Sequence, residues 1–293
     1  MAPRLELLGI GLPEVRPGDD LAGLLAEAFA FEDQDVLVVA SKVVAKAEGR
    51  LVPLAEVKPS ARARQLARKT GKDPVMAELI LREGQPVGVV PVLALVEAGA
   101  LDPAMLAEDT ERALELLRKD PTLILTLRQN DLYTDAGIDR SNAPEGHAVL
   151  PLQDPDQSAE RIRSGLRART GREVAVLISD TEVFAEGSVE LCRGVAGICP
   201  TRRRFGAPDR TGRPKWGGAE AQAFALCMAA SLLMGQTDEG VPAVVVRGLR
   251  YQDCRRRPTD LAKAAHVLLR ANLRFWGLGR VLLGLLRSRF PRG

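Results

Sequence analysis

The sequence predicts an α+β fold in which helices cover a mixed β-sheet. Three apolar runs have the length and composition of buried strands: Val36–Ala40, residues 173–180 and residues 242–248. They lie far apart in the chain and do not alternate cleanly with helical segments. Clean alternation is typical of a doubly wound parallel sheet, so its absence favours the mixed arrangement.

Local signals support the individual elements. Ser41 directly follows the first strand and is a natural helix start. Two short helical segments end at Gly71 and Gly84, and Ser158 is the expected N-cap of a later helix. The helix expected over residues 219–235 is apolar all round, so it should be buried on every side. The remaining expected segments are a Pro- and Gly-punctuated irregular stretch (84–99), an amphipathic helix (104–120), a strand (122–128) and a basic loop (199–218).

Composition limits the class of ligand. The chain has 293 residues, of which 46% are apolar and 27% charged, enough to bury a core in one or two domains. A formal net charge of +3 suits small anionic ligands better than a nucleic-acid groove. Two Trp, two Tyr and seven Phe are few for stacking bases. We therefore expect small-molecule substrates and no nucleic-acid partner.

The cysteines and the ends of the chain indicate a compartment. Four cysteines form no CxxC pair, and with two scattered histidines they offer no zinc site of usual spacing. Cys192 and Cys199 flank an apolar segment and are expected as buried small hydrophobic residues. The chain has no charged-then-apolar leader and no run of about 18 apolar residues. These observations predict a soluble protein of the reducing cytoplasm.

Three polar loops each follow an apolar element. TDAGIDRSN gathers Asp135, Asp139 and Asn142, the second buried strand ends on Asp180 and Thr181, and LMGQTDEG follows the apolar helix. Carboxylate, hydroxyl and amide oxygens are ligands of hard cations such as Mg²⁺, whose other positions go to water and phosphate. Taken alone, each aspartate is better explained as a helix cap or turn former.

Two lysines supply a candidate phosphate contact. Lys42 and Lys46 lie four residues apart after the first strand, so on a helix their ammonium groups share one face. The alternative is a solvated lysine face, the commoner outcome for such spacing. The chain has no GxxxxGK[ST] loop, no GxSxG elbow and no histidine with a neighbouring carboxylate that marks a base. The sequence thus predicts neither a P-loop fold nor a protein nucleophile.

The order of these motifs resembles the coenzyme F420-0:L-glutamate ligase family, the F420 γ-glutamyl ligases. The resemblance runs from Gly9 to Leu249 through GLPEVRPGDDLA, VVASKVVAKAEGR, AGIDRSN, ISDT, GVAGI and LMGQTDEGVP with VVRGL. It implies a family domain over residues 9–250, an α+β fold built as an intertwined homodimer, and an active site near the subunit interface. It also implies GTP-dependent joining of L-glutamate to the lactyl carboxylate of the deazaflavin precursor F420-0, followed by γ-glutamyl extension.

The resemblance also implies roles for individual residues. Asp139, Asp180, Thr181 and Gln236 match metal ligands, and Lys46 is the catalytic candidate in a metal-assisted transfer. The implied cofactors are GTP as co-substrate, Mg²⁺ or Mn²⁺, and a monovalent cation. GTP would phosphorylate the carboxylate, and the glutamate amine would displace phosphate. The residues that match nucleotide contacts are Leu12, Pro13, Glu14, Val15, Ser41, Lys42, Lys46, Asn142, Met234, Gly235, Gln236, Thr237, Asp238, Glu239, Gly240 and Val241.

The chain also departs from the family pattern. The family motif SDTFGRPWR reads SDTEVFAEG here, Asp135 replaces an asparagine, and Phe224 and Ala225 replace an acidic pair. Residues 91–119 resemble an insertion with its own helix. Metal and nucleotide positions are kept, while positions expected to meet the second substrate are changed. A divergent ligase for another carboxylate or amine is therefore an alternative, as is a nucleotide-binding protein without turnover.

Two basic segments lie outside these motifs. The loop RRRFGAPDRTGRPKW could contact an anionic substrate or be a solvated surface loop. The basic amphipathic tail, residues 251–293, could lie on a membrane surface. Gly277, Gly279 and Gly284 weaken such a helix, which favours packing against the body or a partner subunit.

Overall fold

A five-stranded mixed sheet forms the centre of the protein, whose computed structural model describes residues 4–129, 131–184, 187–217 and 219–254. The strands follow the order β1 (Glu6–Ile10), β10 (Ala243–Arg247), β2 (Val36–Ala40), β8 (Ala175–Phe184) and β9 (Gly187–Ala196). Within this sheet β2 and β8 run parallel, and the other neighbours are antiparallel. The predicted mixed sheet is confirmed, and the three expected strands are its central members.

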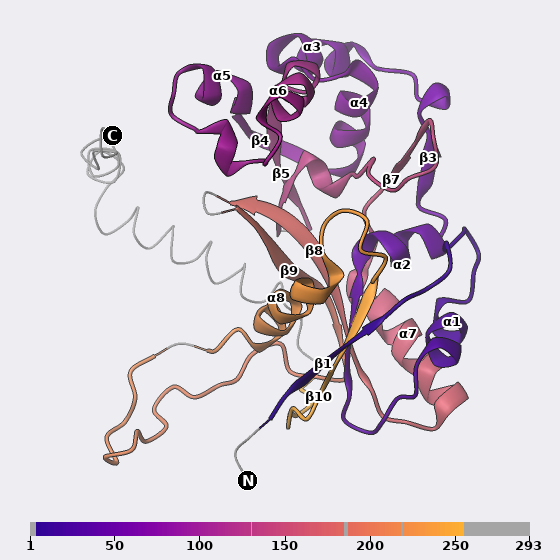
Figure 1. The fold of residues 1–293 in the computed structure, drawn as a ribbon, viewed down its shortest axis with the longest axis vertical. Helices are drawn as coiled ribbons and strands as arrows, with labels where there is room; N and C mark the ends of the chain where they lie inside the picture. Colours follow the sequence, from indigo (N-terminus) through magenta and orange to yellow (C-terminus); the bar gives the residue numbers. More distant parts are fainter. Residues whose placement is uncertain (1–3, 130, 185–186, 218, 255–293) are drawn as a thin grey trace.

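Helices cover both faces of this sheet (Figure 1). The helices α1 (Leu21–Ala28) and α7 (Pro155–Thr170) cover one face, where Leu166 is fully buried. The helix α8 (Gln222–Met234) covers the other face through Leu226. Because successive strand residues point to opposite faces, each central strand contributes to both cores.

A smaller lobe lies above the main sheet in Figure 1. It is built on an antiparallel sheet of order β4-β5-β6, beside a separate pair of strands, β3 and β7. The elements between the main strands are α2 (Ser41–Ala47), β3 (Leu51–Pro53), η1 (Leu54–Glu56), α3 (Ala61–Thr70), α4 (Pro74–Glu83), β4 (Gln85–Val90), α5 (Val92–Glu97), η2 (Pro103–Met105), α6 (Thr110–Lys119), β5 (Leu123–Arg128), β6 (Asp131–Thr134), η3 (Asp135–Gly137) and β7 (His147–Val149). The lobe joins the main sheet where the Thr134 amide and hydroxyl donate to Glu182 on β8, at 2.9 and 2.7 Å.

Two local expectations were wrong. Residues 85–97 are not irregular, because they form the strand β4 and the short helix α5. The Pro and Gly signals are overridden here because β4 is an edge strand paired with β5, a position that tolerates both residues. The N-cap of α7 is Asp154 and not Ser158, because the Asp154 side chain accepts from the Gln157 amide at 3.0 Å.

The expectation that α8 is buried all round was also wrong. The helix lies on one face of the sheet, so its outer side meets solvent and leaves Met228 41% and Leu232 79% exposed. The amphipathic helix expected over 104–120 is present as α6, which begins only after Asp109 caps its first turn. The expected insertion, residues 91–119, contains α5, η2 and α6.

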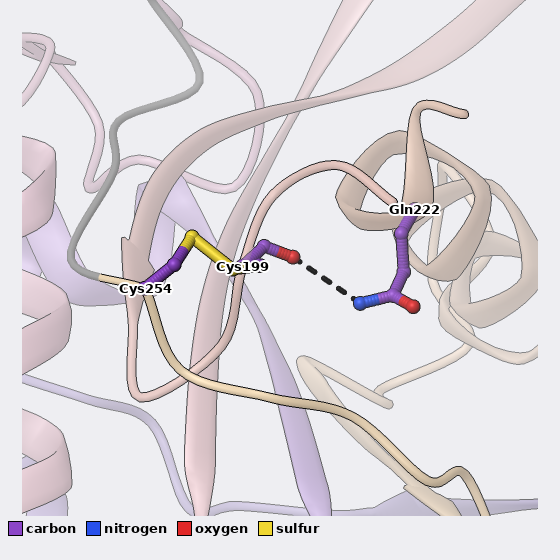
Figure 2. Close-up of a disulfide and its surroundings, with 3 residues drawn as sticks. All are labelled: Cys199, Gln222 and Cys254. Atoms are coloured by element: carbon purple, nitrogen blue, oxygen red, sulfur yellow. Dashed lines mark hydrogen bonds between the residues drawn. A yellow bond between two sulfur atoms is a disulfide. The ribbon is translucent and has the colours of Figure 1, made fainter. Parts of the chain in front are cut away.

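One cysteine expectation was wrong as well. Cys199 is bonded to Cys254 in a disulfide that joins positions 55 residues apart (Figure 2). No spacing rule connects cysteines at such a separation, so the pair could not be predicted from the sequence. Cys192 is a buried free thiol, as expected, and so is Cys227.

The predictions made for the C-terminal tail are not tested by the structure. Residues 255–293, which hold the expected amphipathic segment, lie outside the described residues. Within the described part of the chain, no helix has the length and apolarity needed to cross a bilayer.

Candidate active site

A cavity of about 530 Å³ opens at the end of β2 and beside residues 179–182 in the second half of β8. The lining comes from five parts of the chain: residues 12–15, residues 40–43 with Lys46, Thr134 with residues 137–139 and 141–142, residues 179–182 with Glu190, and residues 234–242. Every residue expected to contact nucleotide or metal lies on these walls. The fold therefore brings together in space the motifs that the sequence analysis connected only by their order.

The parallel pairing of β2 and β8 places two of these motifs side by side. Ala40 at the end of β2 is paired with Ser179 on β8, and α2 begins at the next residue. The Ser41 hydroxyl does not cap α2; it donates to a carboxylate oxygen of Asp180 at 2.5 Å. The helix start expected at Ser41 is thus confirmed, and its side chain serves the cavity.

The two lysines of α2 have separate partners. Lys42 Nζ lies 2.6 Å from Asp139 Oδ2 and also 2.6 Å from Ser141 Oγ. Lys46 Nζ lies 2.6 Å from Glu14 Oε1, with the Lys46 side chain 7% exposed and that of Glu14 71% exposed. The solvated-face alternative does not hold for Lys46, which is buried at the cavity wall. Because Glu14 is in solvent, an incoming anion can compete for the Lys46 ammonium.

The loop that follows η3 holds Asp139 and Asn142 in place. Asp139 exchanges backbone hydrogen bonds with Val149 of β7, and its carboxylate accepts from the Ser141 amide at 2.7 Å. The Asn142 amide group donates to the Thr237 carbonyl at 3.3 Å. This contact joins the loop to the stretch after α8 and closes one side of the cavity.

Asp135 does not reach the cavity, contrary to its grouping with Asp139 as a candidate ligand. Its carboxylate accepts from the Ile124 amide at 2.9 Å and from Lys72 Nζ at 2.5 Å, with the Lys72 side chain 2% exposed. Asp135, Ala136 and Gly137 all have positive φ, at 47°, 58° and 73°. Non-glycine residues rarely adopt this region, so the buried ion pair stabilises a turn that would otherwise be unfavourable.

Gly235 sets the direction of the last wall. It ends α8 with φ 63° and ψ −168°, a backbone region that is essentially restricted to glycine. A Cβ at this position would lie 1.9 Å from the Glu239 carboxyl carbon, so the end of that side chain would also have to move. The turn directs Gln236 into the cavity.

Glu190 on β9 lies at the centre of a polar group that the sequence analysis missed. Its carboxylate accepts from the Ser179 and Thr181 hydroxyls and from the Gln236 amide group, the last at 2.9 Å. Thr181 Oγ1 also lies 3.1 Å from Gln236 Oε1. We call Ser179, Thr181, Glu190 and Gln236 the Glu190 cluster. Glu190 is 5% exposed, and all its donors among the described residues are neutral.

Asp180 lies on the opposite face of the β8–β9 hairpin. Burial raises the pKa of Asp180, and Arg193, whose Nε is 3.7 Å from the carboxylate, partly offsets that rise. The Ser41 hydroxyl also lowers this pKa, while the negative charges of Glu190 and Asp139 raise it. The carboxylates of the cavity are thus close enough to repel one another.

Arg193 holds a second group that the sequence did not reveal. Its guanidinium, 3% exposed, forms ion pairs with Asp131 and Glu182 and lies over the Tyr133 ring, 3.7 Å from the centroid. We call Asp131, Tyr133, Glu182 and Arg193 the Arg193 cluster. One available signal was the presence of Glu182, Glu190 and Arg193 near the apolar residues of β8 and β9, where a buried charge needs a partner.

The expected metal set fits a hard divalent cation by its chemistry. Asp139, Asp180, Thr181 and Gln236 offer only oxygen atoms, which Mg²⁺ and Mn²⁺ prefer. No three His, Cys, Asp or Glu side chains in the described part of the chain are arranged as a metal cluster. The chain therefore supplies two carboxylates and two neutral oxygens, a set that leaves positions for substrate phosphate. Glu190 lies within hydrogen-bonding distance of two members of this set.

Comparison with known proteins gives a consistent result. A family model described as F420-0:Gamma-glutamyl ligase matches residues 9–248. The chain belongs to this family. It is 40% identical to the coenzyme F420:L-glutamate ligase of Methanopyrus kandleri over 240 residues, 81% of this chain and 84% of that protein. Proteins of the same name from Methanothermobacter thermautotrophicus and Archaeoglobus fulgidus are 39% and 36% identical, over 83% and 84% of this chain and 89% and 88% of those proteins.

Family membership confirms the resemblance stated from the motifs. It also confirms that the chain is a ligase. The family match spans the small lobe as well as the main sheet, since residues 9–248 include every strand except the start of β1.

Proposed function

We propose that this chain is a GTP- and divalent-metal-dependent ligase that joins L-glutamate to the carboxylate of F420-0. The names of its relatives supply the substrate class. The observation that carries the proposal is the convergence of all expected nucleotide and metal residues on one cavity. Extension through γ-glutamyl bonds would repeat the same chemistry on the product.

The chemistry proceeds in two transfers. A carboxylate oxygen of F420-0 takes the γ-phosphoryl group of GTP, which gives an acyl phosphate and releases GDP. The glutamate amine then attacks the acyl carbon, the amide bond forms, phosphate leaves and the amine gives up a proton. Neither transfer needs a protein nucleophile, and the work of the chain is positioning and charge stabilisation.

Residues of the cavity divide this work. Lys46 and Lys42 would hold phosphate oxygens, and Lys46 is the candidate for stabilising charge during the phosphoryl transfer. The segments 12–15 and 234–241 would enclose the rest of the nucleotide. A divalent ion held by Asp139, Asp180, Thr181 and Gln236 would neutralise phosphate charge during the transfer.

A homodimer is part of the proposal. The outer side of α8 exposes Met228 and Leu232, and the small sheet exposes Val87, Val89 and Leu132 at 51%, 45% and 47%. Apolar side chains gathered in this way are typical of interaction surfaces. Light scattering of the purified protein would give twice the chain mass, and Leu232→Asp would shift it toward the mass of one chain.

A second candidate keeps the chemistry and changes the carboxylate substrate. The observation that favours it is Glu182, which takes the place of Phe in the family motif and is ion-paired to Arg193. This pair lies beside Asp180, where the family's altered segment would meet the second substrate. Another carboxylate substrate would then be activated by the same nucleotide and metal residues.

Mass spectrometry separates these candidates. The protein is incubated with GTP, Mg²⁺ or Mn²⁺, L-glutamate and F420-0. A mass gain in glutamate units with GDP release is expected, and it must disappear in Asp180→Ala while that variant stays folded. GDP release without a product would favour another carboxylate, and nucleotide binding without GDP release would favour a protein without turnover.

A further inference from the structure

A second hollow, of about 670 Å³, lies at the start of α8. Four of its lining residues are arginines: Arg202, Arg203, Arg204 and Arg250. None of its lining residues is acidic, and none lines the central cavity. The two hollows lie at opposite ends of α8, whose 13 residues span about 20 Å. The basic loop noted in the sequence therefore does not serve the central cavity of its own chain.

One of these arginines is held in a fixed orientation. Gln222, the first residue of α8, is 8% exposed and donates from its side chain to the Cys199 carbonyl at 3.2 Å (Figure 2). Its side-chain oxygen accepts from Arg202 Nε at 2.6 Å. Arg202 Nη2 also donates to the Arg250 carbonyl at 3.5 Å. The buried Gln222 side chain and the Arg250 backbone thus pre-organise one of the cationic groups that line the hollow.

The disulfide fixes the facing wall. The bond between Cys199 and Cys254 holds the segment after β10 against the segment after β9. The Cys199 amide also donates to the Gln252 carbonyl at 2.7 Å. Arg250 lies in this segment, so its position relative to Arg202 is set by covalent and hydrogen-bonded contacts.

The charges around the hollow are unbalanced. Among the described residues, Arg202, Arg203, Arg204 and Arg250 form no ion pair. Like charges gathered on one concave surface repel one another and focus a positive potential. An anion with several oxygen atoms relieves that repulsion, and guanidinium groups match carboxylate and phosphate oxygens through paired N–H donors.

We propose that this hollow binds a small polyanion carrying neighbouring phosphate or carboxylate groups. The site is separate from the central cavity and does not depend on the proposed ligase reaction. A pyrophosphate-type group and an oligo-γ-glutamate present the same chemistry, so both serve as probes. Binding weakens with added salt, because three of the four arginines are exposed to solvent.

Calorimetry with a matched pair of variants tests the site. Pyrophosphate and tri-γ-glutamate are titrated separately into the wild-type protein and into R203Q/R204Q/R250Q. The control, R68Q/R210Q/R213Q, removes the same charge from exposed positions that do not line the hollow. Loss of three charged contacts is expected to weaken binding at least about tenfold in the first variant, with the control at wild-type affinity.

The calorimetry results distinguish a phosphate site, a carboxylate site and binding in the central cavity. Binding of pyrophosphate alone identifies a phosphate site, and binding of the tripeptide alone identifies a carboxylate site. Pyrophosphate binding that survives R203Q/R204Q/R250Q belongs to the central cavity. Equal affinity of both variants for both probes, or no binding by the wild-type protein at low salt, would overturn the proposal.

Discussion

The carboxylates on the two faces of the β8–β9 hairpin have different hydrogen-bonding and ion-pairing partners. On one face, the Arg193 cluster places a guanidinium against Asp131 and Glu182. On the other, the Glu190 cluster surrounds a carboxylate with two hydroxyls and an amide group. The members of both clusters that lie on β8 and β9 are sent to opposite sides by the alternation of side chains along the strands.

The presence or absence of a counter-charge distinguishes carboxylates that support the fold from a carboxylate that serves another role. A buried charge that has its own counter-charge is part of the folded framework. A buried carboxylate with only neutral donors lowers stability by itself, so its presence requires another explanation. Its position against Thr181 and Gln236, two expected metal ligands, gives that explanation. We therefore propose that the Arg193 cluster mainly supports the fold, with Arg193 also in contact with Asp180, and that the Glu190 cluster serves the proposed reaction.

The largest effect is expected from breaking the Arg193 cluster. Arg193→Met leaves the carboxylates of Asp131, Asp180 and Glu182 without their cation, which should lower the free energy of unfolding by about 3–5 kcal/mol. Equilibrium unfolding in urea measures this. Arg161→Met is the control, since Arg161 is 53% exposed and pairs with Glu48, and it should cost less than about 1 kcal/mol. Equal costs for the two variants would contradict the folding role.

Glu190→Gln should differ from Arg193→Met, because it should lower turnover without lowering stability. The amide keeps the shape and removes the uncompensated charge, so the free energy of unfolding should stay the same or rise. Turnover should fall by about 10- to 100-fold, because Glu190 orients Thr181 and Gln236. Glu160→Gln on the exposed side of α7 is the control for turnover. A destabilised Glu190→Gln with normal turnover would reverse the assignment of the two clusters.

The ion pair of Lys72 and Asp135 extends the comparison to the small lobe. It resembles the Arg193 cluster, because a buried cation meets a carboxylate on a strained turn. A double-mutant cycle with Lys72→Met and Asp135→Asn should give a coupling free energy of about 2 kcal/mol in unfolding experiments. Asp120→Asn, which removes the 58% exposed partner of Lys72, should cost less than about 1 kcal/mol. Additive effects of the first two changes would rule out the pair as the support of the turn.

Lys46→Met tests the nucleotide side of the cavity. The methionine retains most of the apolar stem, so the fold should be kept while the phosphate contact is lost. The dissociation constant for GTP should rise about tenfold, as measured by calorimetry. Lys69→Met, an exposed change on α3, should leave it unaltered. An unchanged GTP affinity in Lys46→Met would remove Lys46 from the nucleotide site.

The smallest effect on stability is expected from a change at Glu78, whose carboxylate does not line the cavity. Hydrogen bonds from Ser60 hold the pKa of Glu78 at about 2, below its ordinary value of 4.5. A lowered pKa in the folded state stabilises the protein above pH 4.5, and this contribution is lost as the pH falls toward 2. Glu78→Gln should therefore be less stable by on the order of 1 kcal/mol at neutral pH. The difference in unfolding free energy between the wild-type protein and Glu78→Gln should shrink as urea titrations are repeated from pH 4.5 toward 2. A difference that is independent of pH would refute this role.

The sequence predicted the parts of the site that have local signals. An apolar strand followed by Ser41 marks both the element and its polar end. The strand expected to end on Asp180 and Thr181 continues to Phe184, so that boundary was wrong: both residues lie inside β8, although they do meet Ser41 in the cavity. Glu190 and Arg193 have no such signal, because their partners come from other strands. A bulge beside Ser179 also changes which residues of β9 face which neighbours, and pattern alone does not show it.

The same limit applies to the fold. The mixed sheet followed from apolar runs, since burial on both faces leaves a continuous pattern. The strand β4 and the disulfide depend on partners that lie 33 or more residues away: Val90 pairs with Leu123, and Cys199 with Cys254. Tertiary pairing overrides local propensity in the first case, and chain separation hides the second.

The disulfide yields a separate stability test. In the chain-entropy account, a bond that closes 55 residues stabilises the folded state by up to about 4 kcal/mol. Cys254→Ser should lower the free energy of unfolding toward that amount. Cys199 should stay unlabelled in the unreduced wild-type protein and become labelled in the variant. Alkylation followed by mass spectrometry counts the thiols. Labelling of all four cysteines in unfolded, unreduced wild-type protein would show that the bond is absent.

We propose that the Glu190 cluster serves the reaction and that the Arg193 cluster serves the fold. The most direct measurement is product formation per folded molecule, by mass spectrometry with GTP, Mg²⁺, L-glutamate and F420-0, for Glu190→Gln and Asp131→Asn side by side. Folded Glu190→Gln is expected to lose most of its product, whereas the folded fraction of Asp131→Asn should retain it. Wild-type product formation by Glu190→Gln, with loss confined to Asp131→Asn, would contradict the proposal.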